Sequence, residues 1–388
     1  MKKILFLSFY FEPDLCAGSF RNSPLLTEVS KRLSDSGRIT VITTKPNRYS
    51  SFKEDALSLE EKTNYTVHRI QLPSHQSGMK DQVIAFRTYY NEVKKIVRDE
   101  KYDLVYASSS RLFTAYLGYT IAKKQGIPLY LDIRDIFVDT MNDVLQQGMI
   151  KRLALPVLKI IEKKVFSYAT HINLISGGFK DYFEKYKSTF SFYPNGIDDV
   201  FLENECDYVS DGNKRIITYA GNIGQGQGLH KIIPQAAQEL GDSYIFQVIG
   251  DGGAKQQLVD EVTQRSLTNV IFKDPVRRNE LIDIYNYSDY LFIHLNDFDA
   301  FKKVLPSKIF ELGTFKKPII AGVGGFANSF MRENISNIIL FKPCDVNDMV
   351  NQVKGYNYHL EDRVEFKNRF KRSQVNQEMA KSILQYLN

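Results

Sequence analysis

A lysine and a glutamate lie three residues apart in the stretch Phe301–Gly325, which reads FKKVLPSKIFELGTFKKPIIAGVGG. Pro306 and Ser307 suit the start of a helix, because proline is preset for the first turn and serine can accept a free backbone N–H. Lys308 and Glu311 then share a face near the helix N-terminus, which favours an anion. A carboxylate such as Glu311 is costly to bury without a partner. Paired hydroxyls of a ribose or hexose would compensate it, and so would a neighbouring lysine on an ordinary helix.

Two strand ends in the second half of the chain are rich in glycine. The sequence ITYAGNIGQGQGLHKII contains Gly221, Gly224, Gly226 and Gly228, and FQVIGDGG contains Gly250, Gly252 and Gly253. Glycines let a backbone approach a phosphate closely, and a helix N-terminus is expected behind the first group. The spacing is neither that of a dinucleotide fingerprint nor that of a P-loop. The two glycine-rich ends therefore indicate a nucleotide without indicating which one.

Charged residues also follow strands in the first half of the chain. The motif LDIRDIF places Asp132, Arg134 and Asp135 at the tip of an apolar strand. Three charges there are hard to explain as core, so we expect a functional role, with Asp135 as the first candidate partner of a substrate hydroxyl. Gly18 and Arg21 open the helix after the first strand and form a candidate seat for a phosphate or sugar, with a tight turn as the alternative.

Strand-like and helix-like segments alternate along the chain. The first series of strands is expected at 4–9, 39–43, 67–72, 104–107, 129–133 and 172–175, and the second at 216–220, 244–249, 270–272, 290–294, 318–321 and 338–341. Alternation of strands with helices indicates parallel sheets covered on both faces, with ligands at the carboxyl ends of the strands. The chain is therefore expected to be an α/β protein.

Two series of strands predict two domains. The polar, turn-rich stretch 195–213 contains NGIDD and SDGN and is the expected linker. We predict an N-terminal domain over 1–197 and a C-terminal domain over 198–365, with a last helix at about 366–388 that packs back on the first domain.

Composition limits the class of protein. The 388 residues are 43% hydrophobic and 25% charged, which is ordinary globular material with enough chain for two cores. The three cysteines have no metal-ligand spacing and cannot all pair, which favours a reducing, cytoplasmic compartment. No stretch approaches the roughly 20 apolar residues that span a bilayer, and the apolar N-terminus is better explained as a core strand than as a signal peptide. The net charge of +6 suits an anionic ligand or a lipid surface and is too small to indicate nucleic acid.

Several motifs occur in the order seen in glycosyltransferase family 4, and the chain resembles that family over nearly its whole length. They are FYFEPD with Gly18, LDIRDIF, NLISGGF with FYPNGID, YAGNIGQGQGL, FQVIGDGG and LPSKIFELGTFKKPIIAGVGG. The resemblance implies the GT-B fold, in which two Rossmann-like, doubly wound domains face across a cleft. It also implies a retaining transferase that moves a hexosyl or N-acetylhexosaminyl unit from a nucleotide-sugar donor, with UDP as the expected nucleotide. The similar branch of the family assembles bacterial surface polysaccharides such as O-antigen, lipopolysaccharide or capsule.

The family's pair of glutamates is only half present. The second glutamate matches Glu311 and is expected to bind the ribose hydroxyls, but the first falls on Lys303. That departure removes the carboxylate that usually holds the donor sugar, and Asp297 or Asp299 is the expected replacement.

The family's cations on the diphosphate fall near Asn222 and Gln227, which are neutral. The charge is therefore expected from Lys308, with Arg277 and Lys303 as further candidates. The full donor-binding set implied by the resemblance is Gly221, Asn222, Gly224, Gln227, Gly250, Asp251, Gly252, Val276, Arg277, Lys303, Leu305, Pro306, Ser307, Lys308 and Glu311.

The implied mechanism needs no protein nucleophile. Lys308 and backbone N–H groups near Gly224 would stabilise the charge on the departing diphosphate. The acceptor hydroxyl would attack from the face that the diphosphate leaves, and its proton would pass to a phosphate oxygen or to Asp135. The catalytic candidates are Asp135, Lys308 and Glu311, and the acceptor-binding candidates are Gly18, Arg21, Arg134 and Asp135. No metal or other cofactor is expected, because the aspartate pairs lack a cluster of oxygen ligands.

The stretch Met149–Tyr168 combines cations with a wide apolar face. One explanation is peripheral docking on the cytoplasmic membrane, where a lipid-diphosphate-linked or glycan acceptor would lie. The other is an ordinary domain helix, which Pro156 and the need for a connector favour.

Two other classes of function remain open at this stage. A sugar-nucleotide epimerase of the same fold would need acid and base groups in the cleft and no acceptor. A degenerate protein that binds a nucleotide-sugar without catalysis would be compatible with Lys303 in place of the glutamate. A sugar-binding protein of the periplasmic type would need a cleavable signal, which the N-terminal residues do not indicate.

Overall fold

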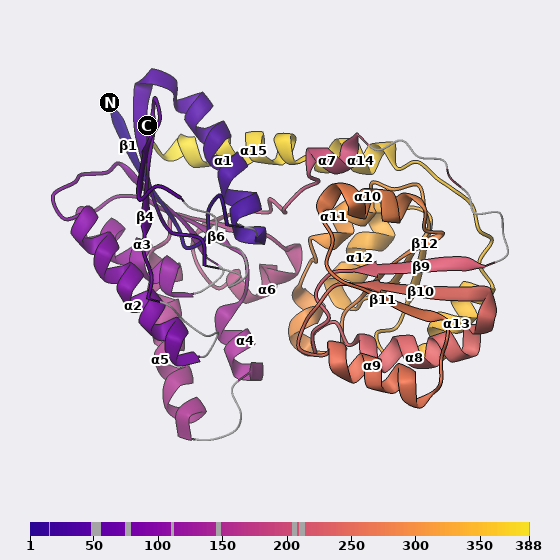
Figure 1. Ribbon diagram of the computed structural model, residues 1–388. Coiled ribbons are helices and arrows are strands. Elements are labelled where there is room, and N and C mark those ends of the chain that lie inside the picture. The colour runs from indigo at the N-terminus through magenta and orange to yellow at the C-terminus, as the bar shows by residue number, and fades with distance from the viewer. Residues whose placement is uncertain are drawn as a thin grey trace. The chain divides into compact units, whose positions relative to one another are not determined.

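The computed structural model describes residues 1–14, 16–47, 56–73, 79–109, 112–144, 149–203, 208 and 214–387 (Figure 1). The chain forms two compact units. Unit 1 comprises Met1–Asn195 and Ser373–Asn388, and unit 2 comprises Gly196–Arg372. Within the expected linker, residues 204–207 and 209–213 lie outside the described residues.

Unit 1 is built on one sheet of eight strands in the order β3-β4-β2-β1-β5-β6-β7-β8. The strands are β1 Lys2–Ser8, β2 Gly37–Thr44, β3 Leu59–Glu61, β4 Tyr65–Ile70, β5 Leu104–Ser109, β6 Leu129–Ile133, β7 His171–Leu174 and β8 Thr189–Ser191. Neighbouring strands are parallel except β3 and β4, which are antiparallel. All six strands predicted for this part are confirmed, whereas the short edge strands β3 and β8 escaped prediction because three residues give too little pattern.

Helices cover both faces of this sheet. They are α1 Ala17–Leu33, α2 Met79–Ile96, α3 Leu112–Gln125, α4 Phe137–Val144, α5 Met149–Tyr168, α6 Lys180–Phe183 and the last helix, α15 Arg372–Leu384. Leu25, Leu26 and Val29 of α1 share a buried cluster with Met379 and Ile383 of α15 on one face. The helices α2, α3 and α5 lie together on the other face (Figure 1).

Unit 2 is built on a fully parallel sheet of six strands in the order β11-β10-β9-β12-β13-β14. The strands are β9 Arg215–Ala220, β10 Tyr244–Ile249, β11 Val270–Lys273, β12 Tyr290–His294, β13 Ile319–Gly322 and β14 Ile338–Phe341, which confirms the second predicted series. The chain moves from β9 to one side, then returns to β12 on the other side. Ligands of such sheets bind where this order reverses, at the carboxyl ends of the two central strands. In unit 2 these strands are β9 and β12.

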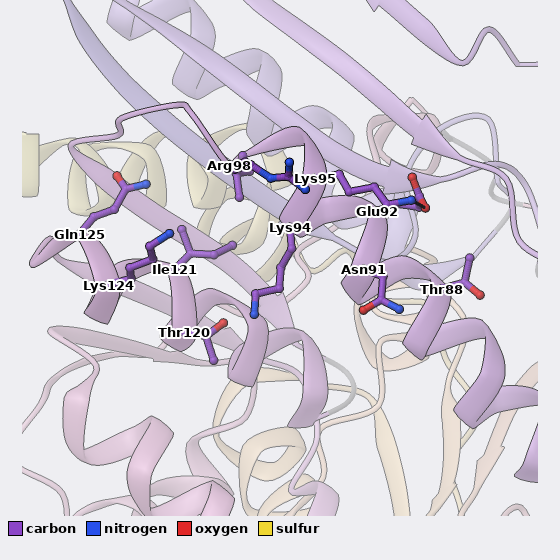
Figure 2. A pocket seen from close by; sticks show the side chains of 11 residues that line it. Thr88, Asn91, Glu92, Lys94, Lys95, Arg98, Thr120, Ile121, Lys124 and Gln125 are labelled. Carbon is purple, nitrogen blue, oxygen red and sulfur yellow. Dashed lines mark hydrogen bonds and ion pairs between the residues drawn. The ribbon is translucent and has the colours of Figure 1, made fainter.

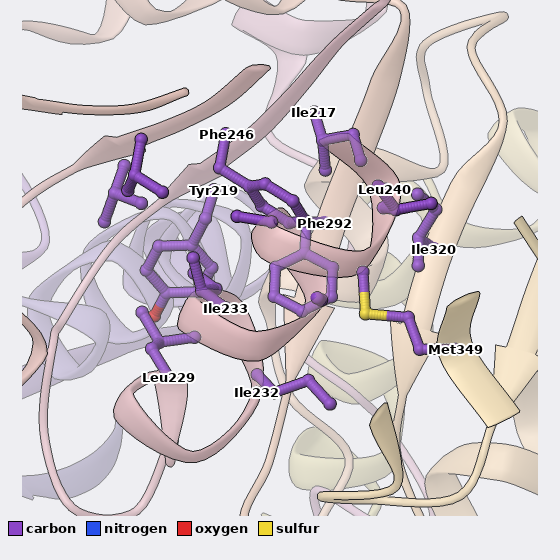
Figure 3. Packing of buried hydrophobic residues seen from close by; sticks show 14 of the residues in the cluster. Ile217, Tyr219, Leu229, Ile232, Ile233, Leu240, Phe246, Phe292, Ile320 and Met349 are labelled. Atoms are coloured by element: carbon purple, nitrogen blue, oxygen red, sulfur yellow. The ribbon is translucent and has the colours of Figure 1, made fainter. Parts of the chain in front are cut away.

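Two buried clusters hold helices on the two faces of this second sheet. The helices are α7 Asp199–Leu202, α8 Leu229–Leu240, α9 Lys255–Gln264, α10 Arg278–Asn286, α11 Lys308–Leu312, α12 Gly325–Asn334, α13 Val346–Lys354 and α14 Val364–Phe370. On one face Ile232 and Ile233 of α8 and Met349 of α13 pack on Phe246 and Phe292 of the sheet (Figure 3). On the other face the cluster combines side chains of α10, α11, α12 and α14. Burial of each large side chain stabilises the fold by about 1.5–3 kcal/mol, so both helix layers are firmly held.

The end of the chain forms two helices where one was expected at about 366–388. Phe366 and Phe370 of α14 are buried in the core of unit 2, whereas Met379 and Ile383 of α15 are buried in unit 1. Unit 2 therefore extends to Arg372, beyond the predicted boundary at 365, because the aromatic side chains of α14 belong to its core. Only α15 returns to unit 1, and the first crossing lies at 195/196, two residues before the predicted one.

Candidate functional site

Hydrogen bonds join the loop after β9 to the loop after β12, at the point where the strand order of unit 2 reverses. The backbone N–H of Asn296 donates to the carbonyl of Gly226 at 2.8 Å, and its side-chain Nδ2 donates to the carbonyl of Gln225 at 3.0 Å. Asn296 is buried. The two loops that border the expected ligand position are therefore fixed relative to each other without a ligand.

Gly221 and Gly250 follow directly after β9 and β10 and have backbone angles that residues with side chains rarely adopt, φ +149° and φ +140°. A Cβ on Gly250 would lie 1.9 Å from the carbonyl oxygen of Gly221. A Cβ on Gly221 would lie 3.2 Å from Cε of Lys308. Glycine at both positions lets the two loops interlock and lets the lysine approach the loop backbone.

Lys308 and Glu311 lie on α11, as the sequence predicted, and a third side chain joins them. Nζ of Lys308 donates to Oε1 of Glu311 at 3.0 Å, and the hydroxyl of Tyr285 donates to the same oxygen at 2.9 Å. Nζ of Lys308 also lies 3.4 Å from the hydroxyl of Tyr285. The side chains of Lys308 and Glu311 are 23% and 22% exposed to solvent, while Tyr285 is fully buried.

All these contacts use one oxygen of the carboxylate. Among the residues that the structure describes, Oε2 of Glu311 has no hydrogen-bond partner. An ammonium has three N–H donors, so Lys308 keeps one beyond the contacts with Glu311 and Tyr285. The arrangement therefore offers an acceptor and a cationic donor side by side. They lie beside the glycine-rich loop after β9, residues 221–228, which we call the glycine loop. The neighbouring lysine that could compensate the charge of Glu311, one of the two possibilities from the sequence, is therefore Lys308. This pairing leaves the second oxygen of the carboxylate available.

The glycine loop is held by its own side chains, which corrects one expectation. Oε1 of Gln227 accepts from Nδ2 of Asn222 at 2.8 Å and from the backbone N–H of Gly224 at 3.2 Å. The N–H of Gly224 is therefore not free for a diphosphate, contrary to the prediction. The first turn of α8 follows directly, contains no acidic residue and leaves N–H groups without helical partners, so it is the better anion site.

The residues before α11 contribute in different ways. Leu305 is buried and its side chain belongs to the core, so only its backbone can face a ligand. Ser307 occupies the position before the helix, but its side chain makes no capping hydrogen bond, which corrects the role that its type suggested. Pro306 accepts through its carbonyl the backbone N–H of Ile309, so it opens the helix as predicted.

The remaining donor candidates lie on loops at the same edge of the sheet. Asp251 follows β10, is exposed, and accepts the N–H of Gly252. Val276 and Arg277 follow β11; Val276 packs on the core, and Arg277 is exposed at the start of α10. Lys303 ends a 3-10 turn, Asp299–Lys303, in the loop after β12.

The two aspartates that were expected to replace the missing glutamate face solvent. The side chains of Asp297 and Asp299 are 59% and 94% exposed, and both lie near Nζ of Lys302, at 3.8 and 2.7 Å. Neither is brought close to Lys308 or Glu311 by a described contact, so the structure gives no support to the replacement.

His294 serves the structure of the site. Its Nε2 accepts the backbone N–H of Cys344 at 2.9 Å, so Nδ1 must carry the proton and donate to the carbonyl of Gln227 at 2.6 Å. The neutral ring thereby joins the glycine loop to the loop after β14. Burial lowers the pKa of His294 to about 4. His294 therefore has a structural role in the site rather than a catalytic one.

We expect the free energy of unfolding to fall between pH 7 and pH 5, by on the order of 2 kcal/mol for each of two buried histidines. His294 in unit 2 and His171 in unit 1 both have pKa values lowered to about 4 by burial. The unfolded chain binds their protons below about pH 6.5, and the folded chain does not, so stability is lost as the pH falls. Urea titrations at the two pH values measure the change. Replacement of the exposed His359 by glutamine should leave it intact.

In unit 1, two of the predicted charges form a buried ion pair. Nε and Nη2 of Arg21 donate to the two oxygens of Asp132 at 2.7 and 2.8 Å, and neither side chain is more than 3% exposed. Arg21 also donates to the carbonyls of Tyr193 and Pro194. Burial alone would raise the pKa of Asp132, but Arg21 and a hydrogen bond from Asn173 outweigh it and hold the pKa below its ordinary value.

This geometry corrects two expectations. Arg21 cannot bind an acceptor, because its guanidinium is buried and each nitrogen donates to an oxygen of the protein itself. Asp132 is core, although its charge at a strand tip suggested a functional role. The pair instead anchors the end of unit 1 just before the chain crosses at 195/196.

Arg134 and Gly18 are brought together at the carboxyl edge of the same sheet. A Cβ on Gly18 would lie 2.8 Å from Nη1 of Arg134, so the guanidinium lies directly against the backbone of Gly18 and would have to shift to admit a side chain. Nε of Arg134 is buried and has no hydrogen-bond partner among the described residues. Asp135 follows directly, is partly exposed and already has a partner in the protein. Arg134, Gly18 and Asp135 therefore remain the acceptor candidates of unit 1.

Sequence reasoning missed two residues of the site. Tyr285 has the pattern of an ordinary core aromatic on α10, and nothing in the sequence indicates that its hydroxyl reaches Glu311. Asn296 could have been found, because it is a polar residue just after a buried strand at the reversal of strand order. Among the residues that the structure describes, no three His, Cys, Asp or Glu side chains are grouped so that they could hold a metal ion.

A comparison with protein-family models matches one part of the chain. Residues 202–377, nearly all within unit 2, match the family model described as "Glycosyl transferases group 1". Solved structures similar over the whole chain have the GT-B fold, which confirms the fold predicted from the sequence. The match to the family model supports a glycosyltransferase.

A comparison with curated proteins finds a relative that is similar over a short segment only. A curated relative is WcaI of Escherichia coli (strain K12), named as a colanic acid biosynthesis glycosyl transferase, at 41% identity over 71 residues. That match spans only 18% of this chain and 17% of the relative.

Among solved structures, Anabaena HepE in complex with UDP-glucose has a TM-score of 0.67 at 15% identity and covers 99% of this chain and 100% of its own. WaaG, a glycosyltransferase involved in lipopolysaccharide biosynthesis, has a TM-score of 0.61 at 14% identity. The match covers 98% of this chain and 95% of the WaaG chain. The apo structure of OtsA has a TM-score of 0.68 at 9% identity. The match covers 100% of this chain and 99% of the OtsA chain. At these identities the likeness shows the fold.

Proposed function

We propose that the protein is a retaining glycosyltransferase that moves a sugar from a UDP-sugar to a glycan or lipid-linked acceptor in the synthesis of a surface polysaccharide. The observation that carries the proposal is the cluster of Lys308, Glu311 and Tyr285 beside Gly221, within the part of the chain that matches the family model. UDP is the favoured nucleotide because similar structures, including HepE, were solved with UDP or UDP-glucose. The similarity to WcaI and WaaG supports a polysaccharide product.

In this proposal unit 2 binds the donor. The free Oε2 of Glu311 accepts from the two ribose hydroxyls, while Tyr285 and Lys308 hold Oε1 and so fix the direction of the carboxylate. The remaining N–H of Lys308 and the first turn of α8 face the diphosphate. These donors are in place before the reaction, so they stabilise the charge that develops on the leaving group without reorganisation.

Unit 1 supplies the acceptor residues. Among the described residues the buried Nε of Arg134 has no hydrogen-bond partner, so Arg134 and the backbone at Gly18 suit an anionic or hydroxyl-bearing part of the acceptor. The acceptor hydroxyl attacks the anomeric carbon from the face that the diphosphate leaves, so the configuration is retained. The bond from the anomeric carbon to the diphosphate breaks as the bond to the acceptor oxygen forms, and the proton passes to a diphosphate oxygen or to Asp135.

The helix α5 is the proposed contact with the cytoplasmic membrane. Val157 and Ile160 on it are 55% and 56% exposed, and Lys159 and Lys163 beside them are exposed as well. Exposed apolar side chains flanked by cations are typical of helices that lie in the interface of an anionic bilayer. Pro156 lies inside the helix and does not end it, so it does not argue against the contact. Among the described residues, no helix is long and apolar enough to cross a membrane.

We expect Lys308→Ala to lower the turnover of UDP-sugar about 10²-fold, because one preorganised donor to developing charge contributes about 2.7–4 kcal/mol to the transition state. The measurement is release of UDP from UDP-sugars by the purified protein, with and without membrane extract as a source of acceptor. Lys302, an exposed lysine of the preceding turn, offers the matched control, and Lys302→Ala should keep turnover within about threefold. Release of UDP that is equal in both variants would contradict the role of Lys308. No release from any UDP-sugar by the unaltered protein would contradict the transferase.

A further inference from the structure

Unit 1 contains a basic groove that the proposed transfer reaction does not use. It lies between α2 and α3, has a volume of about 610 Å³, and is lined by side chains of both helices and of the turn after α2 (Figure 2). The helix α3 joins the carboxyl end of β5 to the amino end of β6, and α2 ends before β5 begins. The groove, which is lined by the last turns of both helices, is therefore at the amino edge of the sheet. Gly18 and Arg134 lie at the opposite edge.

Most of the positive charge in this groove has no ion-pair partner among the described residues. Four cations line it, Lys94, Lys95, Arg98 and Lys124, against one carboxylate, Glu92. Glu92 pairs with Lys95 at 2.7 Å. Among the described residues, Lys94, Arg98 and Lys124 form no ion pair, and Nζ of Lys94 lies 5.0 Å above the ring of Tyr90. Three cations around one groove attract an anion, because each lowers the energy of a negative charge between them.

The other lining residues indicate what kind of anion fits. Thr88 and Asn91 bring a hydroxyl and an amide for neutral hydrogen bonds, and the apolar lining is limited to the buried Val97 and Ile121. Among the lining residues there is no aromatic side chain, so a stacked nucleic acid base has no platform. No exposed apolar side chain enters the groove, so an acyl chain has nothing to pack on. Cations mixed with hydroxyl and amide groups suit a molecule that carries both charges and hydroxyls.

We propose that the groove between α2 and α3 binds an anionic oligosaccharide, with Lys94, Arg98 and Lys124 on its negative groups and Thr88 and Asn91 on its hydroxyls. The site lies within unit 1 and is separate from the donor residues of unit 2. A growing acidic glycan could be held there without occupying the transfer site. The binding itself needs neither a nucleotide nor catalysis, so it stands independently of the proposed transferase.

A simpler explanation of these cations is available and guides the choice of variants. Lys94 and Lys124 lie in the last turns of α2 and α3, where a cation stabilises the helix end. Lys31 and Lys354 have the same position on α1 and α13, are exposed, and lie outside the groove. The pair K94Q/K124Q and the pair K31Q/K354Q therefore remove the same charge from equivalent helix positions.

The test is titration calorimetry of the full chain with trigalacturonate at low salt, and with the neutral trisaccharide maltotriose for comparison. We expect trigalacturonate alone to bind, K94Q/K124Q to weaken its binding at least about fivefold, and K31Q/K354Q to change it less than about twofold. Added salt should weaken the binding of the unaltered protein, because these charges are exposed. Equal affinity of both variants, equal affinity for maltotriose, or no binding of trigalacturonate would each overturn the proposal. Vesicles of phosphatidylglycerol bound through Lys94 and Lys124, with no trigalacturonate binding, would assign the groove to a lipid surface instead.

Discussion

Replacement of Glu311 by alanine is expected to weaken the binding of UDP at least about 100-fold. The carboxylate is held by Tyr285 at 2.9 Å and by Lys308 at 3.0 Å, both on Oε1, which leaves Oε2 to accept from the two ribose hydroxyls. Each hydrogen bond to a charged group contributes about 1.5–3 kcal/mol, and two of them account for about 10²-fold or more in affinity. Titration calorimetry with UDP measures the loss directly.

Two further variants separate the carboxylate from the groups that hold it. Glu311→Gln keeps the size of the side chain and should lose most of the affinity as well, because an amide accepts through one oxygen only. Tyr285→Phe removes a hydroxyl that holds Oε1 but does not bind the ribose itself, so it is expected to cost only about fivefold in UDP affinity. A loss in Tyr285→Phe as large as that in Glu311→Ala, with an unchanged melting temperature, would contradict the assignment of Glu311 to the ribose.

Replacement of Asp132 by alanine is expected to destabilise unit 1 by about 3–5 kcal/mol, because it leaves the buried guanidinium of Arg21 without its counterion. Arg21 is 3% exposed and donates to both oxygens of Asp132. The pKa of the carboxyl is held below its ordinary value in the folded state, so the stabilisation is present at neutral pH and is lost as the pH falls below about 4. Urea unfolding of the full chain, followed by far-UV circular dichroism between pH 3 and pH 7, measures both effects.

The chain offers matched controls for this prediction. The double variant R21M/D132L should be more stable than D132A, because it removes the uncompensated charge together with its partner. Arg32 and Glu28 form an exposed pair on the same helix α1, at 2.6 Å, and Arg32→Ala should cost no more than about 1 kcal/mol. An Asp132→Ala variant as stable as Arg32→Ala would show that the buried pair does not hold unit 1 together.

Hydrophobic runs and turn residues were sufficient to predict the architecture. The predicted strands of both series occur, because a parallel strand buried on both faces needs a continuous apolar run that few other structures produce. The prediction for the last helix was less accurate. Residues 364–370 and 372–384 both have helical patterns, but their apolar side chains are buried in different units, which a periodic pattern does not reveal.

The candidate site was predictable only in part. Lys308 and Glu311 followed from their spacing on one short helix, since residues three apart share a face. Tyr285 comes from another helix, and its contact with Glu311 depends on tertiary packing that no local pattern encodes. The error on Arg21 and Asp132 has the same origin. Nothing in the sequence links Arg21 to Asp132, but the fold pairs them across 111 positions of the chain and thereby buries both.

The most direct test of the proposed function is titration calorimetry of the purified, unaltered chain with UDP, GDP and ADP in parallel. Binding of UDP in the micromolar range, lost in Glu311→Ala, is the result that a donor site of unit 2 built on Lys308, Glu311 and Tyr285 predicts. Binding of GDP or ADP in place of UDP would keep the site and correct the nucleotide. Absence of binding by all three would contradict the nucleotide site, and with it the glycosyltransferase that we propose.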